Sequence, residues 1–141
     1  MILVDTSVWI DFLTGRDTPH RRLLHRLLEN EEEICITEII LAEILQGIKE
    51  DADYDTVKNY LLEFPIIKPN GIHSYIMAAE IYRKCRRYGK TVRKTIDCII
   101  AAIAIENKVA LFHNDVDFKV IKKQADLKTI EAVEMAREGL E

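Results

Sequence analysis

The chain lacks most of the features that mark the commonest kinds of site. Its three cysteines, Cys35, Cys85 and Cys98, have no paired spacing, which supports neither a zinc site nor a disulfide framework. We interpret them as reduced core residues, because a free cysteine behaves as a small apolar side chain. No glycine-rich loop is present to hold a nucleotide phosphate. Ser7 and Ser74 have no evident histidine partner, so no nucleophilic serine is indicated.

Long apolar runs are also missing. None approaches the roughly 18 residues that a membrane helix needs, and no basic segment followed by an apolar one suggests a secretory signal. We therefore expect a cytoplasmic protein without a membrane anchor. With 141 residues, 48% of them hydrophobic, the chain is predicted to form one domain with a full apolar core. The charged residues 131–141 are predicted to be a peripheral tail.

Short apolar runs alternate with helical patterns along the chain. Strands are predicted at 2–4, 34–36, 64–68, 109–112 and 127–130, with amphipathic or apolar helices between them. This alternation is typical of an α/β fold, in which helices cover both faces of a parallel sheet.

Two of the predicted strands are followed by aspartates. Asp5 comes directly after the first strand, and Asp115 and Asp117 come shortly after the strand that ends at Phe112. Ligands of an open parallel sheet bind outside the carboxyl ends of its strands. The two strand ends therefore predict one shared acidic pocket.

Two further acids lie in predicted helices. Glu43 stands between Ala42 and Ile44 in a largely apolar helix, where an unpaired buried carboxylate is costly. It therefore needs a compensating cation or a position facing an opening. Asp97 lies in the first turn of a helix that is apolar almost all round, which we predict to be buried with its N-terminus at the acidic pocket. The helix dipole alone also explains an acid at that place.

Cap residues predict where two of these helices begin. Thr6 and Ser7 are good caps for the first helix, and Thr95 is a good cap for the helix that carries Asp97. Asp11 falls on the polar side of the first helix, and we interpret it as a solvated acid.

Several carboxylates in one cleft repel each other unless some are protonated or a cation lies among them. Mg²⁺ or Mn²⁺ suits an all-oxygen site with open water positions. Such an ion lowers the pKa of a bound water and neutralises charge on a phosphoryl group. We therefore predict Asp5, Asp97 and Asp115 as ligands. Glu43 is predicted either to bind the ion through water or to orient the nucleophile.

A basic segment without any acid runs from residue 83 to 94, although the net charge of the chain is −4. Cations suit a helix C-terminus by themselves. Their density beside an acidic pocket also suits a nucleic-acid backbone. The candidate contacts to such a backbone are Arg86, Arg87, Lys90, Arg93 and Lys94.

His113 precedes the acidic pair by two residues. It could contact a substrate phosphate, donate a hydrogen bond to Asp115, or be held by a local hydrogen bond at the strand end. The other three histidines, His20, His25 and His73, are interpreted as surface residues.

Four segments of the chain resemble the signature segments of PIN-domain ribonucleases, most closely those of the VapC toxins of prokaryotic toxin–antitoxin pairs. They are Val-Asp5-Thr-Ser-Val-Trp-Ile-Asp, Ala-Glu43-Ile-Leu-Gln-Gly, Thr-Ile-Asp97-Cys-Ile-Ile-Ala-Ala and His-Asn-Asp115-Val-Asp-Phe. Each segment is weak evidence alone, but the four occur in the right order across roughly residues 1–130. The resemblance implies a three-layer α/β/α fold with a short central parallel sheet of four to five strands.

The resemblance also implies an activity and partners. The implied activity is endonuclease cleavage of RNA, which depends on Mg²⁺ or Mn²⁺ and leaves 5′-phosphate and 3′-hydroxyl ends. The implied partners are a second copy of the chain, in a homodimer, and a VapB-like antitoxin that neutralises the toxin by placing its tail in the active-site groove. The acidic positions of the family fall on Asp5, Glu43, Asp97 and Asp115, with Asp117 as an accessory acid, Thr6 as the hydroxyl of the first motif, and His113 where the family often has Thr or Ser.

Three alternatives remain open at this point. A phosphatase of the haloacid dehalogenase type also begins with a strand ending in aspartate, but it needs a second aspartate where this chain has Ser7. A receiver-like phosphoacceptor domain needs adjacent acids and a late lysine at a strand end, and neither is evident. The third is a non-catalytic protein whose acids bind a basic antitoxin tail and whose dimer helps a partner to bind operator DNA.

Overall fold

Five short parallel strands form the centre of the protein. The computed structural model describes residues 1–132, so the predicted tail lies outside the described residues except for positions 131 and 132. The strands are β1 (Ile2–Val4), β2 (Ile34–Thr37), β3 (Ile66–Ile67), β4 (Ala110–Phe112) and β5 (Thr129–Ile130). They lie in the order β3-β2-β1-β4-β5, and all four neighbouring pairs are parallel. This confirms the predicted α/β class and the size of the sheet.

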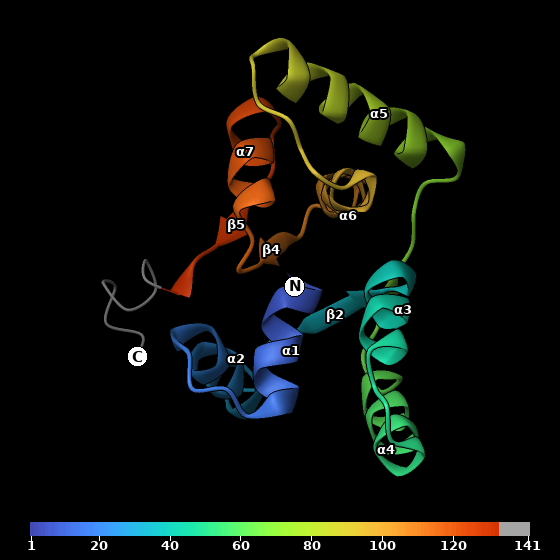
Figure 1. Ribbon diagram of the computed structural model, residues 1–141, viewed down its shortest axis with the longest axis vertical. Coiled ribbons are helices and arrows are strands. Elements are labelled where there is room, and N and C mark those ends of the chain that lie inside the picture. Colours follow the sequence, from blue (N-terminus) through green and yellow to red (C-terminus); the bar gives the residue numbers. More distant parts are fainter. Residues whose placement is uncertain (133–141) are drawn as a thin grey trace.

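Helices cover both faces of the sheet (Figure 1). One side carries α1 (Thr6–Thr14), α2 (Pro19–Glu29), α3 (Glu38–Gln46) and α4 (Asp51–Leu61), and the other carries α5 (Ile72–Arg87), α6 (Thr95–Glu106) and α7 (Val116–Gln124). The two groups follow from right-handed crossovers, because the chain steps from β1 to β3 in one direction and then returns past β1 to β4 and β5. Within residues 1–132, no helix has the length and apolar character needed to cross a bilayer.

The most buried helix is α6, as its apolar sequence predicts. Seven of its residues are buried, among them Cys98, Ile100 and Ala101. Its alanines are small enough to let it pack closely, and the element that it contacts most extensively is α5. The packing fixes the N-terminus of α6, and with it Asp97, near the carboxyl edge of the sheet.

A cluster of aromatic side chains fixes the direction in which α1 leaves β1. Trp9 is buried, with its ring centroid 5.8 Å from that of Phe12, 6.2 Å from that of Tyr60 and 5.5 Å from that of Phe64. The pairs with Phe12 and Tyr60 are edge-to-face, an arrangement that is favourable beyond the area that it buries. The cluster holds α1 against α4 and the turn before β3.

Two helix starts differ from the prediction. The N-cap of α1 is Asp5, not Thr6 or Ser7, because the Asp5 carboxylate at the end of β1 already accepts from the backbone N–H of Ser7. The N-cap of α6 is Lys94, and its side chain makes no capping hydrogen bond. Thr95 is therefore the first helical residue and not the cap.

Two interpretations of surface residues were wrong. Asp11 is buried, because the chain turns back after α1 and covers it. Its carboxylate accepts from the hydroxyl of Thr18 at 3.1 Å and pairs with Arg16 at 3.9 Å. His20 is half-buried, with its ring stacked on that of Phe112 at 6.0 Å between centroids.

Candidate active site

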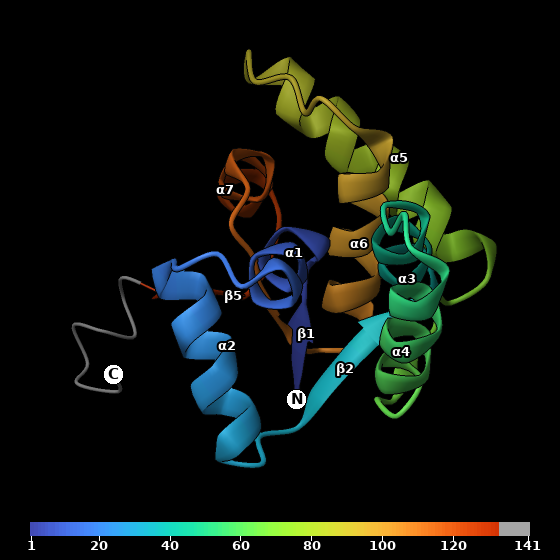
Figure 2. The same cartoon turned by 60° about the horizontal axis from the view of Figure 1, so that its bottom comes forward.

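The carboxyl ends of β1 and β4 meet at one edge of the sheet. Figure 2 shows β1 running from the N-terminus into α1. Val4 lies beside Phe112 in the paired strands, and the backbone N–H of Asp5 donates to the carbonyl of Phe112 at 2.9 Å. Ser7 then links the two loops, since its Oγ donates to Asp5 Oδ2 at 2.6 Å and accepts from the Asn114 N–H at 3.0 Å. This positioning role of Ser7 could not be predicted from the sequence, because its partner Asn114 lies 107 residues away.

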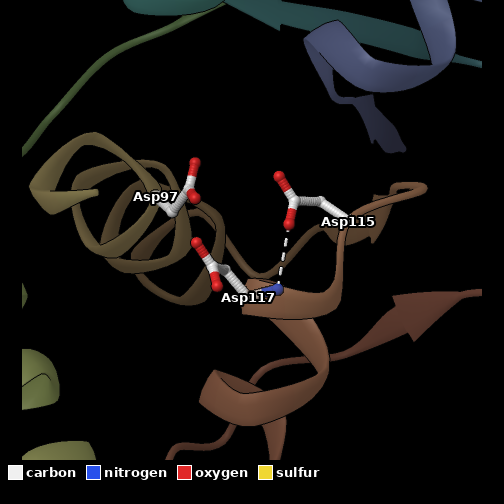
Figure 3. Close-up of side chains that lie close together, drawn as sticks. All are labelled: Asp97, Asp115 and Asp117. Carbon is white, nitrogen blue, oxygen red and sulfur yellow. Dashed lines mark hydrogen bonds between the residues drawn. The ribbon is translucent and has the colours of Figure 1, made fainter. Parts of the chain in front are cut away.

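Three carboxylates gather where α6 and α7 begin (Figure 3). Asp97 lies in the first turn of α6, Asp115 is the N-cap of α7, and Asp117 lies in the first turn of α7. One oxygen from each lies within 4.8 Å of the others, and Figure 3 shows the three side chains pointing toward one another. Asp115 Oδ1 also accepts from the Asp117 backbone N–H at 2.9 Å. Asp97 and Asp117 are buried, whereas Asp115 is partly exposed. We call these three residues the acidic triad.

The carboxyl of Asp97 has a strongly raised pKa. Burial, followed by the negative charges of Asp115 and Asp5, raises the pKa of its carboxyl to about 7. Its Oδ2 is buried and has no hydrogen-bond partner in the described part of the chain. Leaving a buried carboxylate oxygen without a partner is costly. The site therefore favours either a proton or a cation at this position.

Asp5 and Glu43 lie beside the triad. Burial is the main cause that raises the pKa of Asp5, and the nearby charge of Glu43 raises it further. Glu43 accepts a hydrogen bond from the hydroxyl of Thr6 at 2.8 Å, which ties it to α1. Neither acid belongs to the close group of three. Among the described residues, the closest group of carboxylates therefore includes Asp117, the accessory acid of the family resemblance, while Asp5 and Glu43 lie outside that group.

The basic segment meets the triad at one residue. Arg93 Nε donates to the two carboxylate oxygens of Asp117 at 3.2 and 3.3 Å, and its Nη2 donates to Asp115 Oδ1 at 3.3 Å. Lys94 lies close enough for its charge to lower the pKa of Asp97, against the larger effect of burial. The remaining candidate cations are exposed at the end of α5 and in the loop after it; they are Arg86, Arg87 and Lys90.

His113 supports the loop of Asp115 from behind. The ring is buried against Phe118, 5.2 Å between centroids, and its Nδ1 accepts from the Asp115 backbone N–H at 3.2 Å. The hypothesis that it donates to Asp115 was therefore wrong. Burial lowers the pKa of His113 to about 4, so the neutral ring carries its proton on Nε2. The structure instead confirms the third possibility, a local hydrogen bond of His113 at the strand end.

The donor set of the triad fits a small divalent cation. All its donors are carboxylate oxygens, which Mg²⁺ and Mn²⁺ prefer, and no sulfur or imidazole nitrogen is among them. One carboxylate oxygen from each of the three residues lies within 4.8 Å of the others, so a single small ion would be held by all three. The Oδ2 of Asp97, which has no hydrogen-bond partner among residues 1–132, is a further group that such an ion would satisfy.

The chain belongs to the PIN domain family, whose model matches residues 2–124. It is 36% identical over 129 residues to ribonuclease VapC11 of Mycobacterium tuberculosis and to VapC ribonuclease Mb1587 of Mycobacterium bovis, covering 91% of this chain and 96% of each relative. This confirms the family that the four sequence segments indicate.

Solved structures share the fold. One is VapBC2 from Rickettsia felis bound to a DNA fragment from its promoter, with a TM-score of 0.72, 21% identity, and coverage of 93% of this chain and 98% of that one. Another is VapC20 of Mycobacterium tuberculosis, described as a sarcin-ricin loop cleaving toxin, with a TM-score of 0.61, 14% identity, and coverage of 91% and 99%.

Proposed function

We propose that this protein is a metal-dependent endoribonuclease and the toxin of a toxin–antitoxin pair. The observation that carries the proposal is the acidic triad at the carboxyl edge of a PIN-family sheet, with Asp5 and Glu43 beside it. The names of the relatives at 36% identity support the same activity, since both are VapC ribonucleases. We propose Mg²⁺ or Mn²⁺ as the cofactor, and a phosphodiester bond of RNA as the substrate.

The acids have two proposed roles, which are to bind the ion and to position the attacking water. Asp97 and Asp115 are the proposed direct ligands, with Asp117 as a third oxygen donor and Asp5 completing the site from β1. When bound, the ion lowers the pKa of a water molecule and neutralises the charge that grows on the phosphoryl group. Glu43 either binds through water or orients the attacking water, and Thr6, whose hydroxyl donates to it at 2.8 Å, fixes the direction of its carboxylate.

The cations of the basic segment are the proposed contacts to RNA. Phosphate contacts position a nucleic acid without reading its sequence, and exposed arginines and lysines on one stretch of chain suit that role. We assign it to Arg86, Arg87, Lys90, Arg93 and Lys94. His113 is buried, so we assign it to positioning the Asp115 loop instead of contacting the substrate.

A VapB-like antitoxin is the proposed partner. The fold is shared with VapBC complexes from Rickettsia felis, Salmonella typhimurium and Haemophilus influenzae. An acidic region that binds a cation also suits a basic segment of a partner chain. We further propose that the toxin is a homodimer and acts in the cytoplasm, where its RNA substrate is present.

The first experiment removes one carboxylate without removing its helix cap. Asp5→Asn keeps a side chain that caps helices about as well as aspartate, so the fold is retained. We expect wild-type protein to cleave RNA with Mn²⁺ and not with a chelator, and the variant to cleave at least about 100-fold more slowly. Cleavage of a labelled RNA, resolved on a denaturing gel, measures both rates.

The matched control is Asp126→Asn, which changes an exposed acid outside the site in the same way. It should cleave like the wild type. An Asp5→Asn protein that cuts as fast as the wild type would show that the catalytic assignment is wrong. Wild-type protein that cuts no RNA with any divalent ion would favour the non-catalytic alternative, in which the acids only bind a partner.

A further inference from the structure

Arg93 contacts the two members of the acidic triad that belong to the β4–α7 loop and helix. Its guanidinium makes ion pairs with Asp117 at 3.2 Å and with Asp115 at 3.3 Å. These are the same carboxylates that would ligate a divalent cation. The positive charge of the arginine and that of the ion cannot both lie against them without repulsion.

We propose that Arg93 is the built-in counter-ion of the metal-free site, and that a divalent cation and the guanidinium compete for Asp115 and Asp117. This inference rests on the proposed function, because it assumes that the triad binds a metal ion. In the metal-free protein the arginine offsets the repulsion among the carboxylates. In the metal-loaded protein it is displaced from them and becomes free to contact a phosphate.

The arginine is the partner that can move. Its side chain is 64% exposed, whereas those of Asp115 and Asp117 are 17% and 4% exposed. The acids are also fixed by the start of α7, since Asp115 accepts from the Asp117 backbone N–H. The contacts of Arg93, at 3.2 to 3.3 Å, are longer than the roughly 2.7–2.9 Å of strong charge-assisted hydrogen bonds, so a divalent ion does not have to displace a strong hydrogen bond.

The backbone beside Arg93 keeps the displaced side chain near the site. Val92 is buried in the core, and Lys94 is the N-cap of α6. The backbone on both sides of Arg93 is therefore part of the packed structure, whereas the Arg93 side chain is 64% exposed even while it contacts the acids. Displacement needs only rotation of the side chain, which is fast compared with movement of a loop.

The test compares Mn²⁺ binding to wild-type protein and to Arg93→Gln, both stripped of metal with a chelator and then dialysed. Isothermal titration calorimetry gives the Kd without any use of RNA. Because the competing charge is gone, we expect the variant to bind Mn²⁺ about fivefold more tightly or better. In chelator, its melting temperature should fall by a few degrees, because the carboxylates have lost their counter-ion.

Two further variants separate competition from a general effect of charge. Arg83→Gln removes an exposed positive charge from α5, and we expect its Kd and melting temperature to match those of the wild type. Arg93→Lys keeps the charge at the site, and its Kd should return toward the wild-type value.

If Arg93→Gln binds Mn²⁺ no more tightly than the wild type, the proposal that Arg93 competes with the metal ion is wrong. The proposed nuclease activity is not affected by that result. An equal gain in affinity for Arg93→Lys or Arg83→Gln also overturns the proposed competition, because the effect then does not depend on a charge at this position. Wild-type protein that does not bind Mn²⁺ at all overturns the proposed function and this inference with it.

Discussion

Asp97 connects the acidic triad to the stability of the metal-free protein. Its pKa of about 7 in the folded state lies above the usual value near 3.8, so the folded protein holds a proton that the unfolded chain releases between these two values. The free energy of unfolding therefore falls as the pH rises through this window. The carboxylates that would bind a metal at neutral pH thus lower stability when the metal is absent.

Asp97→Asn removes this penalty, because an amide does not ionise. Relative to the wild type in chelator, we expect the variant to gain about 2–3 kcal/mol of unfolding free energy on going from pH 5 to pH 8. Urea unfolding at the two pH values measures it. The contribution of His113, whose pKa is lowered to about 4 and which therefore destabilises the fold as the pH falls, is present in both proteins and cancels.

Asp126→Asn is again the control, since it alters an exposed acid outside the site. The difference in unfolding free energy between Asp126→Asn and the wild type should be the same at pH 5 and at pH 8. If Asp97→Asn differs from the wild type by the same unfolding free energy at pH 5 and at pH 8, burial and the neighbouring acids do not raise the pKa of Asp97. The three carboxylates of the acidic triad then do not lie as close together as described.

The positions of the acids could be predicted from the sequence, but their environment could not. Asp5 and Asp115 follow strands, and Asp97 begins an apolar helix, so their patterns point to one edge of the sheet. The burial of Asp11 depends on how the chain turns after α1, and the role of Ser7 depends on a loop more than 100 residues away, at Asn114. Neither contact leaves a signal in the local pattern.

At the scale of the elements, the basic segment combines a helix end with part of the site. Cys85 and Val92 are buried and hold the segment on the core, while the charged side chains between them face solvent. Within residues 1–132, Arg93 hydrogen-bonds to the acids and Lys94 lowers the pKa of Asp97, both from the far end of the segment. The sequence could predict the charge of the segment but not which of its residues reach the site.

Replacing Arg86 and Arg87 together by glutamine tests whether the segment binds RNA. Each phosphate contact to a single strand contributes about 0.7 to the slope of log K against log salt. In the Asp5→Asn background, chosen so that the RNA is cut slowly, we expect replacement of both arginines to lower the salt slope by about 1.4 and to weaken binding to unrelated RNAs equally. Fluorescence anisotropy over a range of salt concentrations measures the slope.

The paired control replaces Lys123 and Lys128, two exposed cations near β5, by glutamine in the same background. Its net charge change is identical, so an effect of total charge would appear in both. An unchanged salt slope for the arginine variant would show that Arg86 and Arg87 do not contact RNA. Their role would then be to complement the dipole at the C-terminus of α5.

At the scale of the whole molecule, the sequence predicted a parallel sheet but not its strand order. The order β3-β2-β1-β4-β5 places β1 at the centre, between β2 and β4. It depends on the crossover from β3 to β4, which carries the chain over the opposite face of the sheet through α5 and α6. Strands of two residues, such as β3 and β5, have too few side chains to specify their neighbours.

The surface of α5 leads to the last prediction, which concerns the proposed homodimer. Ile72, Tyr75 and Ile76 are 71%, 48% and 49% exposed and follow the i, i+3, i+4 spacing of one helix face. Among the described residues nothing covers this stripe, and we propose that a second copy of the chain does. Light scattering after size exclusion should give about twice 16.3 kDa for the wild type and the monomer mass for a variant with Ile72→Lys and Ile76→Lys. Leu62→Lys, which changes an exposed apolar residue next to α4, should remain dimeric. A double variant that stays dimeric would place the interface on another surface, and a monomeric wild type would remove the dimer from the proposal.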